Sequence, residues 1–178
     1  MIRSWRDNAD RERLADMLTI WTWVLPGLSV LVMLLASAVL PIVNTLPFLP
    51  DLGLMQLVAW RLYRADLMPP WLAFPLGMAA DIFMGQPVGV NATAWPATLL
   101  VLALAERRLP LRDMRVDWVL AGVAILGARL LGWWLLALCG YSLPAPPILL
   151  VIAATILFFP LVARWTAWME RKWLAVAV

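Results

Sequence analysis

The chain has 178 residues, of which 64% are hydrophobic and 14% charged, and its mean hydropathy is +0.86. This composition excludes an ordinary soluble protein and indicates an integral membrane protein. The lack of His and the single Cys139 exclude histidine acid–base catalysis, most zinc sites and an internal disulfide. The net charge of +3 comes from short basic clusters between apolar runs, a pattern typical of membrane topology rather than of nucleic-acid binding.

The chain begins with a charged segment, residues 1–17, which we interpret as a cytoplasmic lead-in. The apolar run from Leu18 to Leu40 predicts the first transmembrane helix, loosened at Pro26-Gly27. It is longer than the hydrophobic region of a signal peptide, about 7 to 15 residues, so cleavage after Ala36-Ser37-Ala38 is not expected.

Five further apolar segments predict transmembrane helices. The second span is shorter than the roughly 20 residues of a straight crossing and reads either as a short span or as a re-entrant half-helix. We favour the span, with Arg61 reaching toward the interface. These spans are Leu52 to Tyr63, Trp71 to Gly85, Ala92 to Ala105, Trp118 to Leu138 and Ile148 to about Ala163, followed by a cytoplasmic tail at residues 164–178.

Basic residues alternate strictly across the predicted connections. Lys and Arg occur in the N-terminal segment, the loops at 64–70 and 106–117, and the tail, and they are missing from the other three connections. Because cytoplasmic segments collect Lys and Arg, this predicts an all-α bundle of six transmembrane helices with both ends in the cytoplasm, forming a single domain over residues 1–178.

Most tryptophans fall near the predicted membrane interfaces, as expected of aromatic belts. At the inner interface these are Trp21, Trp23, Trp60, Trp71, Trp118, Trp165 and Trp168, and at the outer one Trp95, Trp133 and Trp134.

The charged residues most clearly inside predicted spans are Asp81 and Arg129. Asp81 is twelve residues past Pro69 and Arg129 twelve past Asp117, so both lie about 18 Å from the inner boundary at 1.5 Å per residue. We therefore predict that Asp81 and Arg129 form an intramembrane pair, directly or through water.

Two other interpretations of these charges remain open. Arg129 can extend to the outer interface while Asp81 only caps the turn at Gly85. Alternatively, Asp81 is a proton or cation site in a transporter, although one acid without a second acid or a His provides little basis for a proton relay. We favour a structural role for Asp81, with Gly77 on the same helical face for close packing and Gly85, Pro87, Gly89 and Asn91 forming the turn that follows.

Three motifs stand in order between residues 50 and 108. Pro50-Asp51-Leu52 precedes the second span, Gly77 stands four residues before Asp81, and the following turn reads Gly85-Gln86-Pro87-Val88-Gly89-Val90-Asn91. In these motifs the chain resembles the bacterial rod shape-determining protein MreD family. Where that family often has Leu beside the Asp, this chain has Met78, Ala79 and Ala80.

The resemblance implies a non-enzymatic scaffold of the cell-elongation machinery, located as a multi-pass protein in the bacterial inner membrane. It implies binding to the bitopic protein MreC, and through MreC to MreB, RodA and a penicillin-binding transpeptidase, in support of peptidoglycan synthesis at the lateral wall. Contact with membrane lipid is expected and self-association is left open. The implied fold is similar to the substrate-binding subunits of energy-coupling-factor transporters.

That likeness also supplies an alternative function, the binding of a vitamin or another small molecule for a transporter. The polar residues of the predicted outer loops are few, which disfavours it. A membrane transferase ranks last, because no Gly-rich phosphate loop, paired carboxylates or metal-ligand cluster occurs in the sequence. We predict no catalytic residues, no metal, no cofactor and no nucleic-acid partner.

Overall fold

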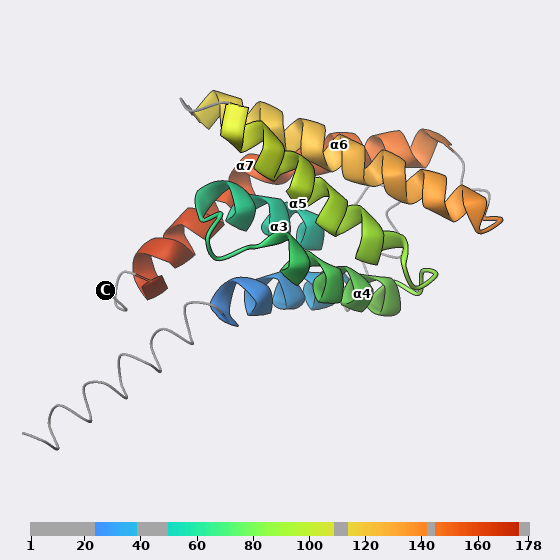
Figure 1. Ribbon diagram of the computed structural model, residues 1–178, viewed down its shortest axis with the longest axis horizontal. Coiled ribbons are helices and arrows are strands. Elements are labelled where there is room, and N and C mark those ends of the chain that lie inside the picture. The colour runs from blue at the N-terminus through green and yellow to red at the C-terminus, as the bar shows by residue number, and fades with distance from the viewer. Residues whose placement is uncertain (1–23, 39–49, 109–113, 142–144, 175–178) are drawn as a thin grey trace, which may run out of the picture.

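In the computed structural model, residues 24–38, 50–108, 114–141 and 145–174 are described, and regular structure in these ranges is helical. The six α-helices of the described ranges agree with the predicted all-α class. Their bounds, in chain order, are Val24–Ala38, α3 (Leu52–Tyr63), α4 (Ala73–Phe83), α5 (Val90–Arg108), α6 (Met114–Leu138) and α7 (Ala145–Met169) (Figure 1). A 3-10 turn, η1 (Pro70–Leu72), leads into α4, and a π-helical turn, η2 (Glu170–Leu174), extends α7.

The predicted tail begins inside a helix. α7 passes the predicted end at Ala163 without a break, continues to Met169 and then into η2. Neither Gly nor Pro follows Pro160, so nothing in the local sequence stops the helix where the apolar run stops. Hydropathy marked the end of the apolar segment, which is not the end of the helix.

The first predicted span extends beyond the described residues at both ends, and the lead-in at 1–17 and the connection at 41–49 lie outside them.

The short helix α3 lies at the centre of the bundle. It packs against α5, α6 and α7, and every residue from Gly53 to Leu62 is buried. A helix that is mostly apolar on all faces is expected to be enclosed by protein. The helices that pack on α3 are longer than it is, and α5 packs on α6 and α6 on α7 around it (Figure 1).

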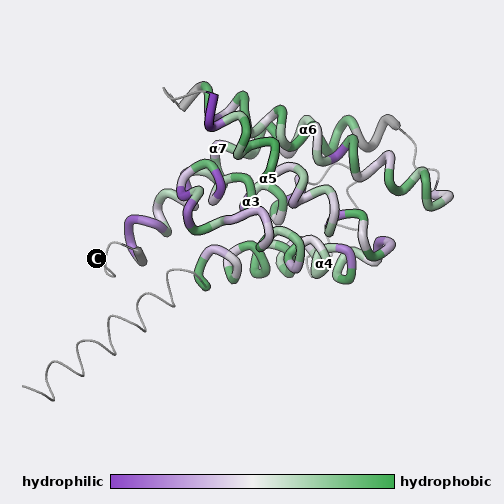
Figure 2. The backbone as a smooth tube through the Cα atoms, in the orientation of Figure 1, coloured by the Kyte–Doolittle hydropathy of each residue, from purple (hydrophilic) through white to green (hydrophobic). Residues whose placement is uncertain are grey.

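The outer helices carry apolar side chains outward. α6 and α7 contain the two segments of the described residues that are long and apolar enough to cross a membrane, Val116–Leu138 and Leu149–Lys172. Val119, Val123 and Leu157 are among their exposed residues. Figure 2 shows apolar colouring over most of the helices, with hydrophilic colouring mainly near helix ends and loops. Such a surface suits lipid rather than water.

A buried polar cluster joins three helices inside the bundle. The indole Nε1 of Trp60 donates to Ser29 Oγ at 2.7 Å, and Gln56 Nε2 donates to the same oxygen at 3.3 Å. Thr166 Oγ1 in turn bonds Gln56 Oε1 at 3.3 Å. These bonds tie helix Val24–Ala38 to α3 and α3 to α7. In lipid, interhelical hydrogen bonds of this kind specify which helix faces meet.

The predicted aromatic belt is wrong at two positions. Trp60 and Trp95 are buried in the core, because α3 and the first half of α5 lie inside the bundle rather than at its surface. Among the described residues, the tryptophans with exposed side chains are Trp71, Trp118, Trp133, Trp134, Trp165 and Trp168, as a belt requires, while Trp21 and Trp23 lie outside these residues.

The end of the bundle where α3 and α5 finish and α6 starts, here called the Arg61 end, is held by ion pairs. Arg61 does not extend to the surface as predicted, because its guanidinium pairs with Glu106 at 2.8 Å and donates to the carbonyls of Ala65 and Met68. Its side chain is therefore buried.

A second ion pair at the Arg61 end connects the α3–α4 loop to α7. Arg64 pairs with Asp66 at 2.9 Å and with Glu170 at 3.3 Å. Hydrogen bonding from Arg64 lowers the pKa of the Asp66 carboxyl, although partial burial opposes the shift. The ionised Asp66 therefore stabilises the loop when the pH is above the ordinary pKa of an aspartate. This contribution to stability is lost as the pH falls through the lowered pKa of Asp66.

Candidate functional site

The opposite end of the bundle, here called the Asp81 end, contains the predicted site residues. It comprises the starts of α3, α5 and α7 and the ends of α4 and α6. Two acidic residues are buried there, Asp81 and Asp51, and each bonds a different set of partners.

The carboxyl group of Asp81 binds the backbone at the start of α5. Its Oδ2 accepts hydrogen bonds from the amide nitrogens of Gly89 at 2.8 Å and Ala92 at 3.3 Å, and its Oδ1 accepts from Asn91 N at 2.8 Å. The first amides of a helix have no partner within the helix. Asp81, which is 0% exposed, satisfies these donors from the neighbouring helix α4. The alternative in which Asp81 caps the turn at Gly85 comes nearest to this geometry, but the carboxyl accepts from the amides of Gly89, Asn91 and Ala92 at the start of α5.

The turn between α4 and α5 has the backbone that its glycines permit. Gly85 and Gly89 have φ values of 64° and 117°, which L side chains rarely adopt. A Cβ at either position would meet nothing within 4 Å, so conformation rather than space requires glycine. The carbonyl of Pro87 accepts from Val90 N at 3.4 Å, and the Asn91 side chain donates to Gln86 Oε1 at 3.0 Å. The turn is therefore bonded both to itself and to Asp81.

Gly77 lies where the backbones of α4 and α5 are in close contact, closer than at any other described glycine. A Cβ built on Gly77 would lie 2.6 Å from the carbonyl carbon of Asn91 and 2.8 Å from the Cα of Ala92. Both are backbone atoms, so the neighbour has no flexible end that can move aside. The helix that holds Asp81 against α5 can take this position only with glycine at residue 77.

Arg129 pairs with Asp51, and the predicted direct pair between Arg129 and Asp81 is wrong. The Asp51 carboxyl accepts from Arg129 Nη2 and, through Oδ1, caps α3 by accepting from Leu54 N at 3.0 Å. The backbone nitrogen of Asp51 donates to Thr155 Oγ1 of α7 at 3.2 Å. The equal depth predicted for Asp81 and Arg129 is consistent with their position at one end of the bundle. Asp81, however, accepts hydrogen bonds from the amides of α5, and Arg129 pairs with Asp51 at the start of α3.

The cluster formed by Asp51, Arg129 and Thr155 therefore joins α3, α6 and α7. We expect Asp51→Asn and Arg129→Gln to be coupled in a double-mutant cycle, with an interaction free energy of about 1 to 3 kcal/mol. Removing Arg129 alone leaves the buried Asp51 without its counter-charge, which is costly, and removing Asp51 leaves the partly buried Arg129 unpaired. The measurement is the thermal unfolding of the purified variants in detergent.

The matched control is a second double-mutant cycle, in which Asp81→Asn takes the place of Asp51→Asn and is combined with Arg129→Gln. Asp81→Asn and Arg129→Gln should give additive losses, because Asp81 bonds the amides of α5 whereas Arg129 bonds Asp51. Coupling as large as that between Asp51 and Arg129 would contradict the assignment.

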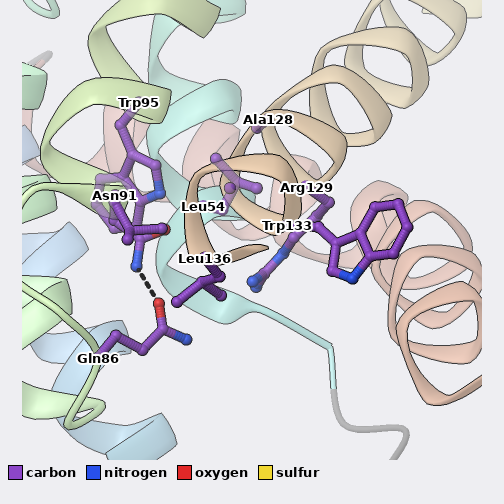
Figure 3. Close-up of a pocket in the computed structure, with 10 residues that line it drawn as sticks. Leu54, Gln86, Asn91, Trp95, Ala128, Arg129, Trp133 and Leu136 are labelled. Carbon is purple, nitrogen blue, oxygen red and sulfur yellow. Dashed lines mark hydrogen bonds between the residues drawn. The ribbon is translucent and has the colours of Figure 1, made fainter. Parts of the chain in front are cut away.

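A small cavity lies between the two acidic clusters. Its volume is about 80 Å³, and its polar lining comes from Gln86, Asn91 and Arg129, with Trp95 and Trp133 among the other lining residues. Figure 3 shows the bonded Gln86 and Asn91 on one side of the cavity and Arg129 beside Trp133 on the other. The Nε of Arg129 is buried and has no hydrogen-bond partner among the residues that the structure describes. This volume accommodates a few waters or one small polar side chain.

Sequence reasoning missed the role of Asp51 and Thr155. Asp51 enters the sequence analysis only as part of the Pro50-Asp51-Leu52 motif. A signal was present, because Asp directly before an apolar helical segment is a common helix cap. Thr155 gave none, since threonine in an apolar span usually bonds its own helix, as Thr155 Oγ1 also does to Val151 O.

A family comparison extends across nearly all of this architecture. The family model for the rod shape-determining protein MreD matches residues 17–167. The chain belongs to the MreD family. The resemblance seen between residues 50 and 108 is thereby confirmed and extended to the flanking helices. Comparisons with curated proteins and with solved structures gave no match.

Membership in the MreD family identifies a rod shape-determining membrane protein. The two long apolar segments in α6 and α7 agree with membrane insertion. The matched region includes both acidic clusters, the glycine contact and the cavity, so these belong to the part of the chain that the MreD family shares.

Proposed function

We propose that this MreD family member is a non-enzymatic, multi-pass scaffold of the bacterial inner membrane that binds MreC. Through MreC it supports the elongation machinery, with MreB, RodA and a penicillin-binding transpeptidase, in building the lateral wall. The observation that carries the proposal is the family match over residues 17–167.

The bonding of the two buried acids supports a scaffold. Asp81 gives its oxygens to three backbone amides, and Asp51 caps α3 while pairing with Arg129. Each group fixes one helix against another. Carboxyl groups engaged in this way hold a defined arrangement of helix ends, which a binding partner requires.

The cavity at the Asp81 end gives little support to vitamin binding. Ligand pockets for molecules of that size commonly have volumes of about 300–1,000 Å³. The volume of about 80 Å³ between Gln86, Asn91 and Arg129 is far smaller. At the Asp81 end, where the predicted outer loops lie, this comparison favours the scaffold over a transporter subunit.

Depletion of the protein in its bacterial host tests the proposal. Cells should lose rod shape and become round, and expression of the wild-type chain from a second copy should restore rods. MreC should co-purify with the affinity-tagged protein after mild detergent extraction. Rods that persist after complete depletion, or vitamin uptake lost while shape is kept, would overturn the proposal.

We also propose that both chain ends lie in the cytoplasm, as the distribution of Lys and Arg predicts. The exposed Cys139, at the end of α6, then faces the exterior of the inner membrane. A membrane-impermeant thiol reagent should label it in cells whose outer membrane, where present, has been made permeable.

A cysteine at the Arg61 end provides the matched control for topology. In a Cys139→Ala background, Asp66→Cys should react only after the inner membrane is opened. The reverse pattern would show that the orientation is inverted.

A further inference from the structure

A second and larger cavity lies at the Arg61 end, between α3, α6 and α7, with a volume of about 350 Å³. Its deeper lining is apolar and buried, formed by Leu62, Phe159 and Ala163. The polar lining residues are Tyr63, Asp117 and Arg164, none of which is fully buried. The cavity therefore combines an apolar interior with a hydroxyl, an acid and a base.

One wall of this cavity is fixed by a bond between α6 and α7. Pro160 has no amide hydrogen, so the carbonyl of Ile156, four residues earlier, lacks its usual helical donor. The indole Nε1 of Trp118 donates to this carbonyl at 3.1 Å. Proline thus frees an acceptor on α7, and a tryptophan from α6 occupies it. Trp118 is consequently held beside the cavity, so the space belongs to the packing of the two helices.

The surroundings of the cavity determine what can fill it. In a membrane protein, an apolar space beside exposed tryptophans is filled by acyl chains, because water gains no hydrogen bonds there. A volume of about 350 Å³ is within the range of ligand pockets. Arg164 suits a phosphate group, and Asp117 suits an ammonium group. A carboxylate can accept about four hydrogen bonds, so Asp117 can receive an ammonium in addition to an existing partner.

We propose that this cavity binds a phospholipid whose headgroup carries both a phosphate and a primary ammonium, as phosphatidylethanolamine does. One acyl chain occupies the apolar interior, the phosphate contacts Arg164, and the ammonium donates to Asp117. Charge distinguishes this lipid from phosphatidylglycerol, and hydrogen-bond donation distinguishes it from phosphatidylcholine. Phosphatidylglycerol has no cation for Asp117, and the trimethylated headgroup of phosphatidylcholine has no N–H to donate.

Lipid retention measured by native mass spectrometry tests the proposal. Full-length protein is released from nanodiscs that contain equal amounts of phosphatidylethanolamine, phosphatidylcholine and phosphatidylglycerol. We expect phosphatidylethanolamine to be retained about fivefold over each of the others, the factor that one exposed charge pair can give. Equal retention of all three lipids would overturn the proposal.

Three variants locate the lipid. Asp117→Asn should remove the preference for phosphatidylethanolamine over phosphatidylcholine. Arg164→Gln should weaken the retention of all three lipids. Ala163→Leu should reduce lipid retention by filling the apolar interior of the cavity. Asp66→Asn, an acid at the same end outside the cavity, is the control and should keep the wild-type pattern. Variants are compared only after thermal unfolding shows that they are folded. A folded Asp117→Asn variant with an unchanged preference would contradict the assignment of the ammonium.

Discussion

Replacing Gly77 by alanine is expected to destabilise the protein by about 3 kcal/mol or more, at the upper end of the cost of overpacking. The added Cβ would lie 2.6 Å from the carbonyl carbon of Asn91, so α4 and α5 must separate. Separation also lengthens the bonds from Asp81 to the amides of Asn91 and Ala92. The measurement is the midpoint of thermal unfolding in detergent, which should fall by on the order of 10 °C.

Gly127→Ala is the matched control, since it makes the same chemical change in another helix of the bundle. A Cβ on Gly127 meets nothing within 4 Å. Alanine is favoured over glycine inside a helix by about 0.5–1 kcal/mol, so this variant should be as stable as the wild type or slightly more stable. Equal losses in the two variants would contradict the close contact at Gly77.

Replacing Asp81 by alanine is expected to cost on the order of 2–6 kcal/mol, because the buried amides of Asn91 and Ala92 lose their acceptor and each buried donor left unsatisfied costs about 1–3 kcal/mol. The amide of Gly89, which is only partly buried, loses the same acceptor. Asp81→Asn should also be strongly destabilising. Asparagine has one oxygen, so its amino group must face at least one of these donors. Thermal unfolding and the yield of monodisperse protein after size-exclusion chromatography measure the loss.

Asp66→Asn is the control for removal of a carboxylate. Asp66 lies in an exposed loop and its pair with Arg64 is largely solvated, so the loss should be within about 1 kcal/mol. In cells, Asp81→Ala should fail to restore rod shape after depletion, whereas Asp66→Asn should restore it. Normal yield and normal rods with Asp81→Ala would refute the structural role of Asp81.

The helices were largely predictable, but the partners of the charged residues were not. α3 has the predicted bounds, Leu52 to Tyr63, because an apolar run between Asp51 and Arg64 limits it on both sides. Depth along a helix follows from counting residues, and the count predicts similar levels for Asp81 and Arg129. Which side chain each one meets depends on how the helices are rotated about their axes, and residue counts do not contain that information.

The predictions for Trp60, Trp95 and Arg61 were wrong for a related reason. Belt and snorkelling rules describe residues at the surface of a bundle, and they were applied to α3 and α5 without knowledge of which helix is central. The central position of α3 follows from packing among all the helices. Its shortness was the available signal, because a helix shorter than a normal span is more easily enclosed by its neighbours.

The bonds of Asp81 also suggest an order of assembly in the membrane. Its amide partners lie only 8, 10 and 11 residues further along the chain, whereas Arg129 lies 78 residues after Asp51. Closing a short loop costs less conformational entropy than closing a long one. α4 and α5 can thus enter the bilayer as one hairpin in which the buried acid already has its donors. The Asp51 contact must wait until α6 has been made, and it then closes the bundle around α3.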